Sequence, residues 1–356
     1  MKTTLLTCAT VIGAIACSQQ LPATAETSAP QLATAAETSV PRLSAQATDT
    51  IQSVNAADFS ATAATTARSF DPAVLRLQVL LDRAHFSPGS IDGLAGGNLR
   101  KAVAAYGAAH GVAGDAAVLQ ALIQSDTAPA LVSYTIDATD VAGPFVRIPR
   151  DLQAQSRLHS LGYANAQEAL GEKFHMDPRL LRALNPGASF AAGTEIVVAG
   201  AGGDLDTQVA SIEVDKTLGD VRALDAQGAV LAFYPATIGS GEHPAPTGAF
   251  AVRGVAFNPI YHFDPARLPA FNRADSATFD VAAGPNNPVG LVWIALTADT
   301  YGIHGSPDPE HIGKTESHGC VRLTNWDAME LGHAVRPGVP VTFIEATAQA
   351  AASHPG

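Results

Sequence analysis

The first part of the chain shows apolar residues at helical spacing. Three such patterns fall within residues 70–125. The apolar positions of the first are Val74, Leu77, Leu80 and Leu81. Asp71 can cap this first helix and Pro72 can open it, because the first turn leaves backbone N–H groups that need an acceptor. Asn98 is a candidate cap for the second helix, and Asp115 can start the third. The pattern therefore predicts a small three-helix domain.

A second small unit is predicted over residues 145–200. The stretch EALGEKFH has helical spacing, and Asp177 can cap a further helix that Pro178 opens. The sequence Asn-Pro-Gly ends that helix, and EIVV is typical of a short strand. We expect a small α+β unit of two helices and a closing strand.

From about residue 208 the pattern changes to alternation and to β-branched runs. VASIEVD, DVRAL and AVLAFYP come first, with turn residues between them, and FAVRGV, LVWIAL and VPVTFIE follow. Thr324 is a candidate cap for a single helix near the end. Residues 208–345 are therefore predicted to form a mainly-β, β-sandwich-like domain with one helix. The insert at 254–288 is rich in Asn and Pro and is a candidate lid over a site.

The N-terminus predicts export. Lys2 precedes a short apolar run that is too brief to span a bilayer, and an Ala-x-Ala site ends at Ala25. Residues 1–25 are interpreted as a signal peptide, which implies an exported, periplasmic protein. The alternative is a lipoprotein signal, in which Cys17 carries a lipid that tethers the chain to a membrane. Residues 26–69 are rich in Ala, Thr, Ser and Pro without a sustained period, so a disordered linker is expected.

The charge balance excludes some partners. The chain has 21 Lys and Arg against 33 Asp and Glu, a net charge of −12. Such a balance is not that of a nucleic-acid-binding surface, and no basic cluster predicts binding to anionic lipid.

Cys320 stands alone in the second half of the chain. An isolated cysteine is often a small buried apolar residue, but this one lies among histidines. A cysteine nucleophile needs a base near neutral pH and donors for the oxyanion of a tetrahedral intermediate. The candidate bases are His304, His311 and His318.

Two neighbours of the cysteine suit such chemistry. Gly319 can let the chain turn tightly, and Arg322 is suited to a carboxylate. A zinc site is the alternative, with ligands His304, His311, His318 and Cys320. Its spacing matches none of the common zinc-binding patterns, so we expect no metal.

The segment YGIHGSPDPEHIGKTESHGCVRLTNWD resembles the active-site segment of the L,D-transpeptidase (YkuD-type) family. That family carries His-Gly, a loop, and then S-H-G-C-[IV]-R-L-x-N-x-D, and every one of these positions is filled. The upstream PTGAF is similar to the family's P-x-G-x-F hairpin.

The resemblance implies a role for each matching residue. Cys320 would be the nucleophile and His304 the base, oriented through the backbone carbonyl of Gly305. The supporting and oxyanion residues would be Ser317, His318, Gly319 and Arg322. Arg322 would also meet a substrate carboxylate, and Tyr301 would line the pocket.

The two N-terminal units also resemble known modules. The pattern with Ile91-Asp92-Gly93 is similar to a peptidoglycan-binding three-helix domain. The unit at 145–200 resembles a LysM module, which binds glycan strands, but it lacks the usual Gly-Asp-Thr opening.

Together these resemblances imply an L,D-transpeptidase of peptidoglycan biosynthesis. It would form 3→3 cross-links between stem peptides through a cysteine thioester, with no cofactor. The same thioester could instead serve a carboxypeptidase, a hydrolase or a protein-attaching enzyme. A non-catalytic wall-binding protein is the alternative of another class. The implied partners are peptidoglycan stem peptides and glycan strands, with β-lactams, above all carbapenems, as covalent inhibitors.

Overall fold

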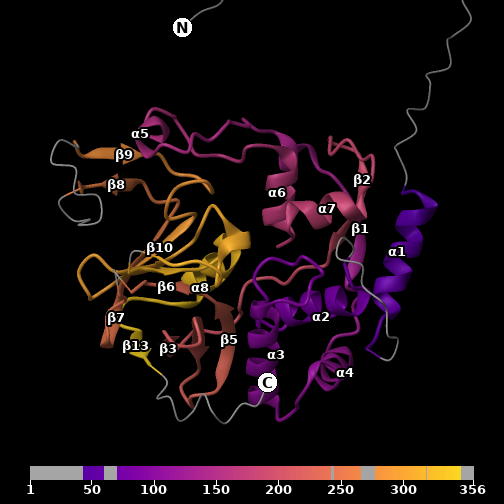
Figure 1. Cartoon of the computed structure of the whole chain (residues 1–356), viewed down its shortest axis with the longest axis horizontal. Coiled ribbons are helices and arrows are strands. Elements are labelled where there is room, and N and C mark those ends of the chain that lie inside the picture. The colour runs from indigo at the N-terminus through magenta and orange to yellow at the C-terminus, as the bar shows by residue number, and fades with distance from the viewer. Residues whose placement is uncertain (1–42, 60–69, 242–243, 266–276, 318, 346–356) are drawn as a thin grey trace, which may run out of the picture. The chain divides into compact units, whose positions relative to one another are not determined.

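The computed structural model describes residues 43–59, 70–241, 244–265, 277–317 and 319–345. The predicted signal over 1–25, the lipidation site at Cys17 and the site residue His318 lie outside these residues. The described residues belong to a single compact unit (Figure 1).

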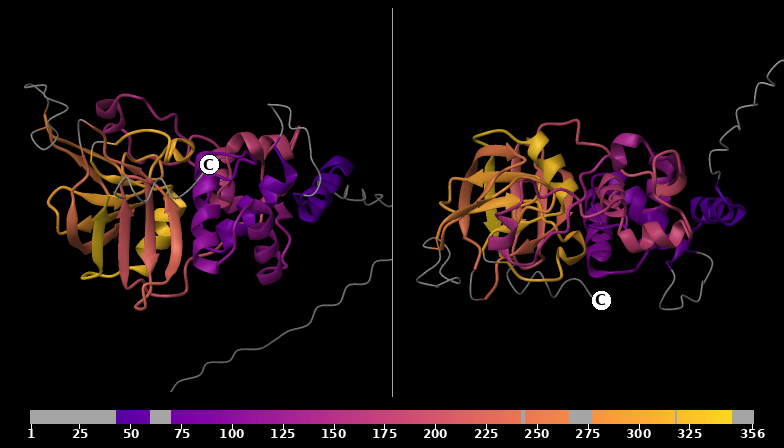
Figure 2. Two further views of the ribbon diagram at one scale, coloured as in Figure 1. Left: turned by 60° about the horizontal axis from the view of Figure 1, so that its bottom comes forward. Right: turned by 90° about the horizontal axis from the view of Figure 1, so that it is seen from above.

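The C-terminal part of the described chain forms a nine-stranded sheet in the order β5-β4-β3-β13-β7-β10-β11-β12-β6. The strands are β3 Ser211–Asp215, β4 Asp220–Leu224, β5 Val230–Pro235, β6 Thr237–Ile238, β7 Gly248–Phe257, β10 Val292–Leu296, β11 Gly302–His304, β12 Val321–Arg322 and β13 Pro340–Ile344. The pairs β3–β13 and β11–β12 are parallel, and the other neighbours are antiparallel. The mainly-β prediction is confirmed, although the strands form one curved sheet rather than two separate layers (Figure 2).

One helix, α8 Asn325–Ala334, packs on this sheet. The predicted cap is confirmed, because the Thr324 hydroxyl accepts a hydrogen bond of 3.1 Å from the Asp327 amide. Ala328 and Leu331 are fully buried in the core of the sheet. This packing fixes the helix next to the strands that carry the cysteine and histidine.

The three predicted helices of the N-terminal region are α2 Pro72–Arg83, α3 Gly97–His110 and α4 Asp115–Ser125. Asp71 caps α2 by accepting from the amides of residues 73 and 74 at 2.8 and 3.2 Å. The prediction of Asn98 as a cap is wrong. Gly96 occupies that position in α3, and the buried Asn98 amide donates to the Ile312 carbonyl of the sheet domain at 2.8 Å.

The next unit contains β1 Leu131–Thr135, η1 Ala138–Val141, α5 Leu152–Gln155, α6 Ala166–Lys173, α7 Pro178–Leu184 and β2 Glu195–Ala199. The predicted cap and closing strand are present, with Asp177 accepting from the Arg179 amide at 2.7 Å. The sequence pattern does not predict β1, which pairs antiparallel with β2. Strand β1 reads LVSYT, and five residues are too few for an alternating pattern to stand out.

The expected disordered linker is wrong over residues 45–56, which form α1 Ala45–Ala56. Ser44 caps this helix, and Ala47 and Val54 are buried. The Asn55 side chain exchanges two hydrogen bonds with the backbone of Leu131, at 2.8 and 2.9 Å. The helix is stabilised by these contacts with β1, which composition alone cannot reveal.

Helix α2 joins the two N-terminal units in one packed body. Its residues Leu75 and Val79 belong to a core shared with α1, α6, α7, β1 and β2. Its residues Leu77, Leu80 and Leu81 belong to a second core shared with α3, α4 and Phe233 of β5. Because α2 contributes residues to both cores, the two units are packed together and are not independent domains.

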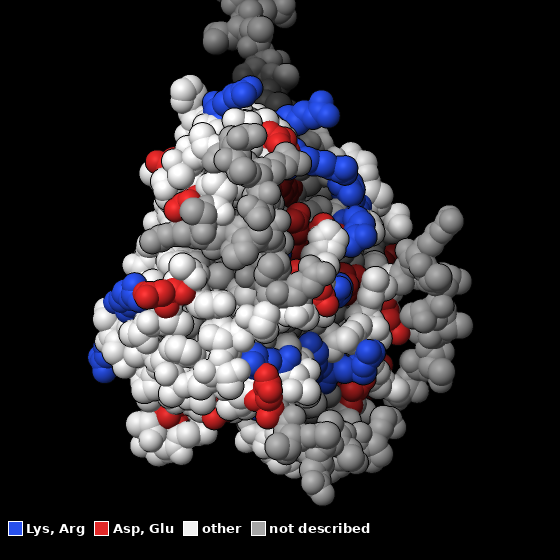
Figure 3. Space-filling view, turned by 60° about the vertical axis from the view of Figure 1, so that its left-hand side comes forward, with Lys and Arg blue, Asp and Glu red and all other residues white. Residues whose placement is uncertain are grey.

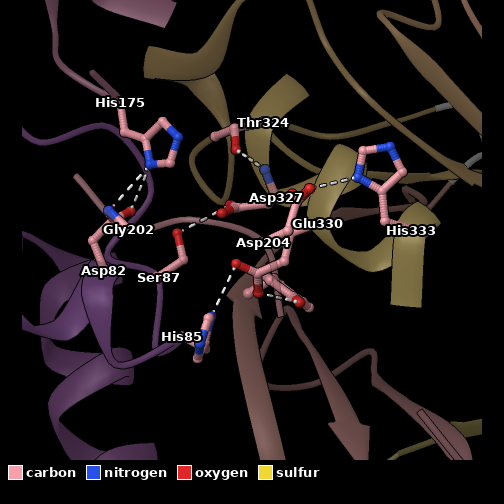
Figure 4. A network of polar contacts seen from close by, with 11 residues as sticks. Asp82, His85, Ser87, His175, Gly202, Asp204, Thr324, Asp327, Glu330 and His333 are labelled. Carbon is pink, nitrogen blue, oxygen red and sulfur yellow. Dashed lines mark hydrogen bonds and ion pairs between the residues drawn. The ribbon is translucent and has the colours of Figure 1, made fainter. Parts of the chain in front are cut away.

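A polar network joins this N-terminal body to helix α8 (Figure 4). The Ser87 hydroxyl donates to Asp327 at 3.0 Å, and His85 lies 3.1 Å from Glu330. His175 stacks on Trp326 with ring centroids 5.1 Å apart and contacts Asp82 at 3.0 Å. The N-terminal body is therefore docked on the helix that directly follows the cysteine segment.

Among the described helices, none is by itself long and apolar enough to cross a membrane. Helices α3 and α4 together have the length and apolar composition of a membrane span, but they are bent by 63° relative to each other. Lys and Arg are interspersed with Asp and Glu on the face shown in Figure 3, as the mixed composition implies.

Candidate active site

The site is built on the parallel pair β11–β12. Ile303 pairs with Val321 and His304 pairs with Arg322. Paired residues of neighbouring strands point to the same face, and residues two apart share a face. Ile303 and Val321 are fully buried in the core, so His304 and Arg322 face the opposite side. Cys320 directly precedes β12, next to the backbone of Gly302 in β11 and within range of the charge of Arg322.

Cys320 is half-buried, and its Sγ atom lies 3.9 Å from the carbonyl oxygen of Thr300. Burial raises the pKa of the Cys320 thiol above its ordinary value, while a hydrogen bond from the Gly302 backbone and the charge of Arg322 act in the opposite direction. The resting thiol is therefore neutral near pH 7, and it needs a base to become a nucleophile.

His304 lies on β11, the strand paired with β12. It is 4% exposed, and its Nδ1 atom lies 2.7 Å from the carbonyl oxygen of Gly305. A carbonyl only accepts, so Nδ1 carries the proton and Nε2 keeps its lone pair. The ring stacks on Trp293 of β10, with centroids 5.4 Å apart. Burial first, and then the charge of Arg322, lower the pKa of His304 to about 4, so the imidazole is neutral and can accept a proton.

Ser317 and Gly319 shape the turn that carries the thiol. The Ser317 hydroxyl donates to the Cys320 carbonyl at 2.6 Å and accepts from the Gly239 amide at 2.6 Å. Gly319 has a φ of +109°, and a Cβ atom there would come within 2.8 Å of the Tyr301 ring. Only glycine fits this position without a shift of the tyrosine. The predicted residues Tyr301, Ser317 and Gly319 thus lie together beside Cys320, and His318 lies outside the described residues.

Arg322 supplies a positive charge next to the thiol. Among the described residues, no carboxylate forms an ion pair with Arg322, although the charge of Asp308 acts on it from a distance. Burial lowers the pKa of Arg322, which nevertheless stays a cation at neutral pH. A half-buried guanidinium without a protein carboxylate is suited to an anionic group of a ligand.

Sequence reasoning missed Tyr261, which comes from β8 Tyr261–Phe263 in the insert. Strand β8 pairs with β9 Phe279–Val281 to form a small hairpin. Burial, followed by the charge of Cys320, raises the pKa of Tyr261, while Arg322 opposes the shift. The tyrosine is thus within electrostatic range of both residues. No motif signalled it, because the insert matches no pattern.

The alternative zinc set is not assembled among the residues that the structure describes. His311 groups with Asp308 and Glu310 at the surface, and neither His304 nor Cys320 belongs to that group.

A large cavity lies away from Cys320, between the N-terminal body and α8. It has a volume of about 600 Å³. Its lining includes Tyr163, Glu172, His175 and Trp326. Burial raises the pKa of Glu172 to about 8.

Comparison with known proteins agrees with this geometry. Residues 210–343 match the family model of the L,D-transpeptidase catalytic domain, YkuD. This part of the chain is similar to L,D-transpeptidase catalytic domains. The match does not extend to the N-terminal units, whose resemblance to peptidoglycan-binding and LysM modules stays a prediction.

Proteins that match this region come from several bacteria. The chain is 28% identical over 178 residues to the putative L,D-transpeptidase YkuD of Bacillus subtilis, which covers 49% of this chain and 91% of the relative. It is 41% identical over 76 residues to the probable L,D-transpeptidase YbiS of Escherichia coli, which covers 21% of this chain and 24% of the relative. A crystal structure of L,D-transpeptidase 3 from Mycobacterium tuberculosis is 18% identical, with a TM-score of 0.32, and covers 42% of this chain and 74% of that one.

Proposed function

We propose that this protein is a peptidoglycan L,D-transpeptidase that forms 3→3 cross-links through a thioester on Cys320. One observation carries the proposal: Cys320 directly precedes β12, and the Nδ1-protonated His304 lies on the adjacent parallel strand β11, in a region that matches the L,D-transpeptidase family model. A thiol, an adjacent base and nearby backbone donors are the parts that acyl transfer requires.

In the first half-reaction, Cys320 Sγ attacks the carbonyl carbon at the L-centre of diaminopimelate in a tetrapeptide stem. His304 Nε2 accepts the thiol proton as the C–S bond forms, and the imidazolium passes that proton to the leaving amine of D-Ala. Backbone N–H groups around Gly319 and Cys320 stabilise the oxyanion of the intermediate. The Gly305 carbonyl holds the ring in the tautomer that this step needs.

In the second half-reaction, the side-chain amine of another stem attacks the thioester. His304 accepts a proton from the amine and returns one to the departing thiolate, which leaves a 3→3 amide bond and free Cys320. No metal or organic cofactor enters either step. Arg322 is proposed to bind a carboxylate of the stem peptide. Carbapenems are proposed to acylate Cys320 in the same way, through their strained amide carbonyl. We also propose that the protein is exported to the periplasm, where the stem peptides are.

Product analysis after incubation with a disaccharide-tetrapeptide tests the proposal. Wild type should release D-Ala and form a dimer with a 3→3 bond, and Cys320→Ala should do neither. D-Ala release without a dimer would instead indicate water as the acceptor. Attachment of a supplied lysine-containing polypeptide would indicate a protein-attaching enzyme. Neither product, with sacculus binding retained, would favour a non-catalytic wall-binding protein.

A further inference from the structure

The insert that carries Tyr261 leaves the sheet beside the site, because Ala256 of β7 and His304 of β11 both pair with Trp293 of β10. The insert is held from outside the catalytic domain. Three hydrogen bonds join its backbone and side chains to residues 161 and 162 of the N-terminal body. The Leu161 amide donates to the Ala283 carbonyl at 2.9 Å, the Asn286 amide donates to the Leu161 carbonyl at 2.9 Å, and the Asn286 side chain donates to the Gly162 carbonyl at 2.9 Å.

Asn286 also makes a charge-assisted contact with Glu168 of α6. Its Nδ2 atom donates to Glu168 Oε1 at 2.5 Å, and the other oxygen of Glu168 accepts from the Ala164 amide at 2.7 Å. Hydrogen bonds to a charged acceptor are stronger than neutral ones. Glu168 is thus fixed on its own helix and holds Asn286 from there.

The backbone fits closely at this junction. Gly284 has a φ of +144°, and a Cβ atom there would lie 2.2 Å from the Leu161 carbonyl oxygen. Residues other than glycine are strained at this φ and would push the two segments apart.

The junction is connected directly to the β8–β9 hairpin. The next residue, Asn287, is fully buried, and its Nδ2 atom donates to the Ala282 carbonyl at 2.8 Å and to the carbonyls of Pro259 and Val281 at 3.3 Å. Pro259 lies just before β8, and Val281 ends β9. A shift at 284–287 is therefore transmitted to both strands of the hairpin.

The N-terminal body is itself anchored on the catalytic domain, so it can hold the insert firmly. Asn325 at the start of α8 donates to Glu172 Oε1 and to the Pro285 carbonyl, both at 3.2 Å. His85 and Ser87 bond to Glu330 and Asp327 of α8 (Figure 4). His175 stacks on Trp326 of the same helix.

We propose that Asn286, held by Glu168 and by the backbone of Leu161 and Gly162, positions the β8–β9 hairpin and its Tyr261 over the thiol site, and so sets the affinity for the donor stem peptide. This inference rests on the proposed function. It gives the LysM-like unit a second role, as a part of the substrate site and not only as a wall anchor. The effect is on the hairpin, so the thiol and its base are left in place.

The test compares variants of the full chain in D-Ala release from a soluble tetrapeptide. Asn286→Ala and Glu168→Ala should raise KM about tenfold with kcat within about twofold. Glu168→Gln should keep most of the wild-type KM, because its amide oxygen still accepts from Asn286. The matched control is Gln167→Ala, which loses a bond to Arg182 within the same body and should behave as wild type.

Two further measurements separate positioning from general destabilisation. In a Tyr261→Ala background, the Asn286→Ala effect should shrink below about twofold, since coupled residues are not additive. Amides of 259–263 and 279–283 should exchange hydrogen faster in Asn286→Ala, while amides of α8 keep the wild-type rate. Three results would overturn the proposal. The first is that the changes in KM from Asn286→Ala and Tyr261→Ala multiply in the double variant. The others are that Asn286→Ala has the same KM as Gln167→Ala, or that it accelerates hydrogen exchange in α8 as much as in the hairpin. Hydrogen exchange decides the question even if wild type turns out inactive on the tetrapeptide, a result that would instead contradict the proposed function.

Discussion

The two halves of the segment SHGCVRLTNWD build very different environments. In the first half, Cys320 and Arg322 are half-buried and have no charged protein partner at hydrogen-bonding distance among the described residues. In the second half, Thr324, Asn325 and Asp327 are at most 3% exposed and bond to one another, to the insert or to the N-terminal body. The first half therefore leaves Cys320 and Arg322 available to a ligand. The second half binds another part of the chain.

This contrast shows that one short motif can serve two purposes. Polar residues that are buried need partners, and the second half finds them in Ser87 and Glu172. Trp326 is the exception, since its Nε1 atom is buried without a partner among the described residues. The following predictions test this division between the two halves, from the largest effect to the smallest.

Replacement of the nucleophile should have the largest effect. We expect Cys320→Ala to lower D-Ala release by about 10³-fold or more, because no other described group near His304 can form the thioester. The thermal midpoint should stay close to wild type, since the thiol makes only a weak contact at 3.9 Å. Steady-state kinetics and thermal unfolding measure the two quantities. A rate of D-Ala release within tenfold of wild type would contradict the catalytic role of the first half of the segment.

Loss of the base should have the next largest effect. His304→Ala should lower kcat/KM by about 10²- to 10⁴-fold. In wild type the pKa of His304 is lowered to about 4, so the base stays neutral and kcat/KM should show no acid limb above about pH 5. The pKa of Cys320 is raised, so alkylation by iodoacetamide should keep accelerating as the pH rises above 8. An acid limb near pH 6.5 would indicate instead a protonated resting histidine.

The second half of the segment, which contacts the N-terminal body, should control the stability of the fold rather than catalysis. Burial raises the pKa of Asp327 to about 8, against about 4 for an unfolded aspartate. Between these values the folded protein holds a proton that the unfolded chain has lost, so the free energy of unfolding should fall as the pH rises from 4 to 8. The raised pKa values of Glu172 and His175 act in the same direction.

Asp327→Asn removes one of these titrations and should flatten the dependence of the thermal midpoint on pH. Glu330→Gln on the same helix is a second test, because it removes the carboxylate that raises the pKa of His85 and should flatten the dependence above about pH 6.5. An unchanged slope in Asp327→Asn would show that this carboxyl does not titrate with folding.

The smallest effect is expected at α1. Asn55→Ala removes two hydrogen bonds to the Leu131 backbone and should lower the free energy of unfolding by about 1–2 kcal/mol, without a change in kcat/KM. Denaturant unfolding measures it, and no loss would mean that α1 is not held by β1.

Much of the site was predictable because its residues lie close together in the sequence. The cap at Thr324, the orientation of His304 through Gly305, and the position of Ser317 beside Cys320 follow from local signals and family resemblance, and the geometry agrees with each. Tyr261 was missed because its proximity to Cys320 depends on a hairpin within an insert that has no characteristic pattern.

The errors in the fold share one cause, which is contact between segments distant in sequence. The sequence predicts a linker where α1 lies, because the stabilising partner of Asn55, Leu131, is 76 residues away. It predicts Asn98 as a cap, because the actual partner of Asn98, Ile312, lies in another domain. Local propensity cannot report such partners, and tertiary packing decides them.

The central claim is that Cys320 carries an acyl group with His304 as its base. Intact-protein mass spectrometry after brief exposure to a tetrapeptide stem tests it most directly, with wild type, Cys320→Ala and His304→Ala side by side. We expect an adduct of the stem minus D-Ala on wild type, a strongly slowed adduct on His304→Ala and none on Cys320→Ala. An adduct that persists on Cys320→Ala, or its absence from wild type while D-Ala is released, would contradict the account.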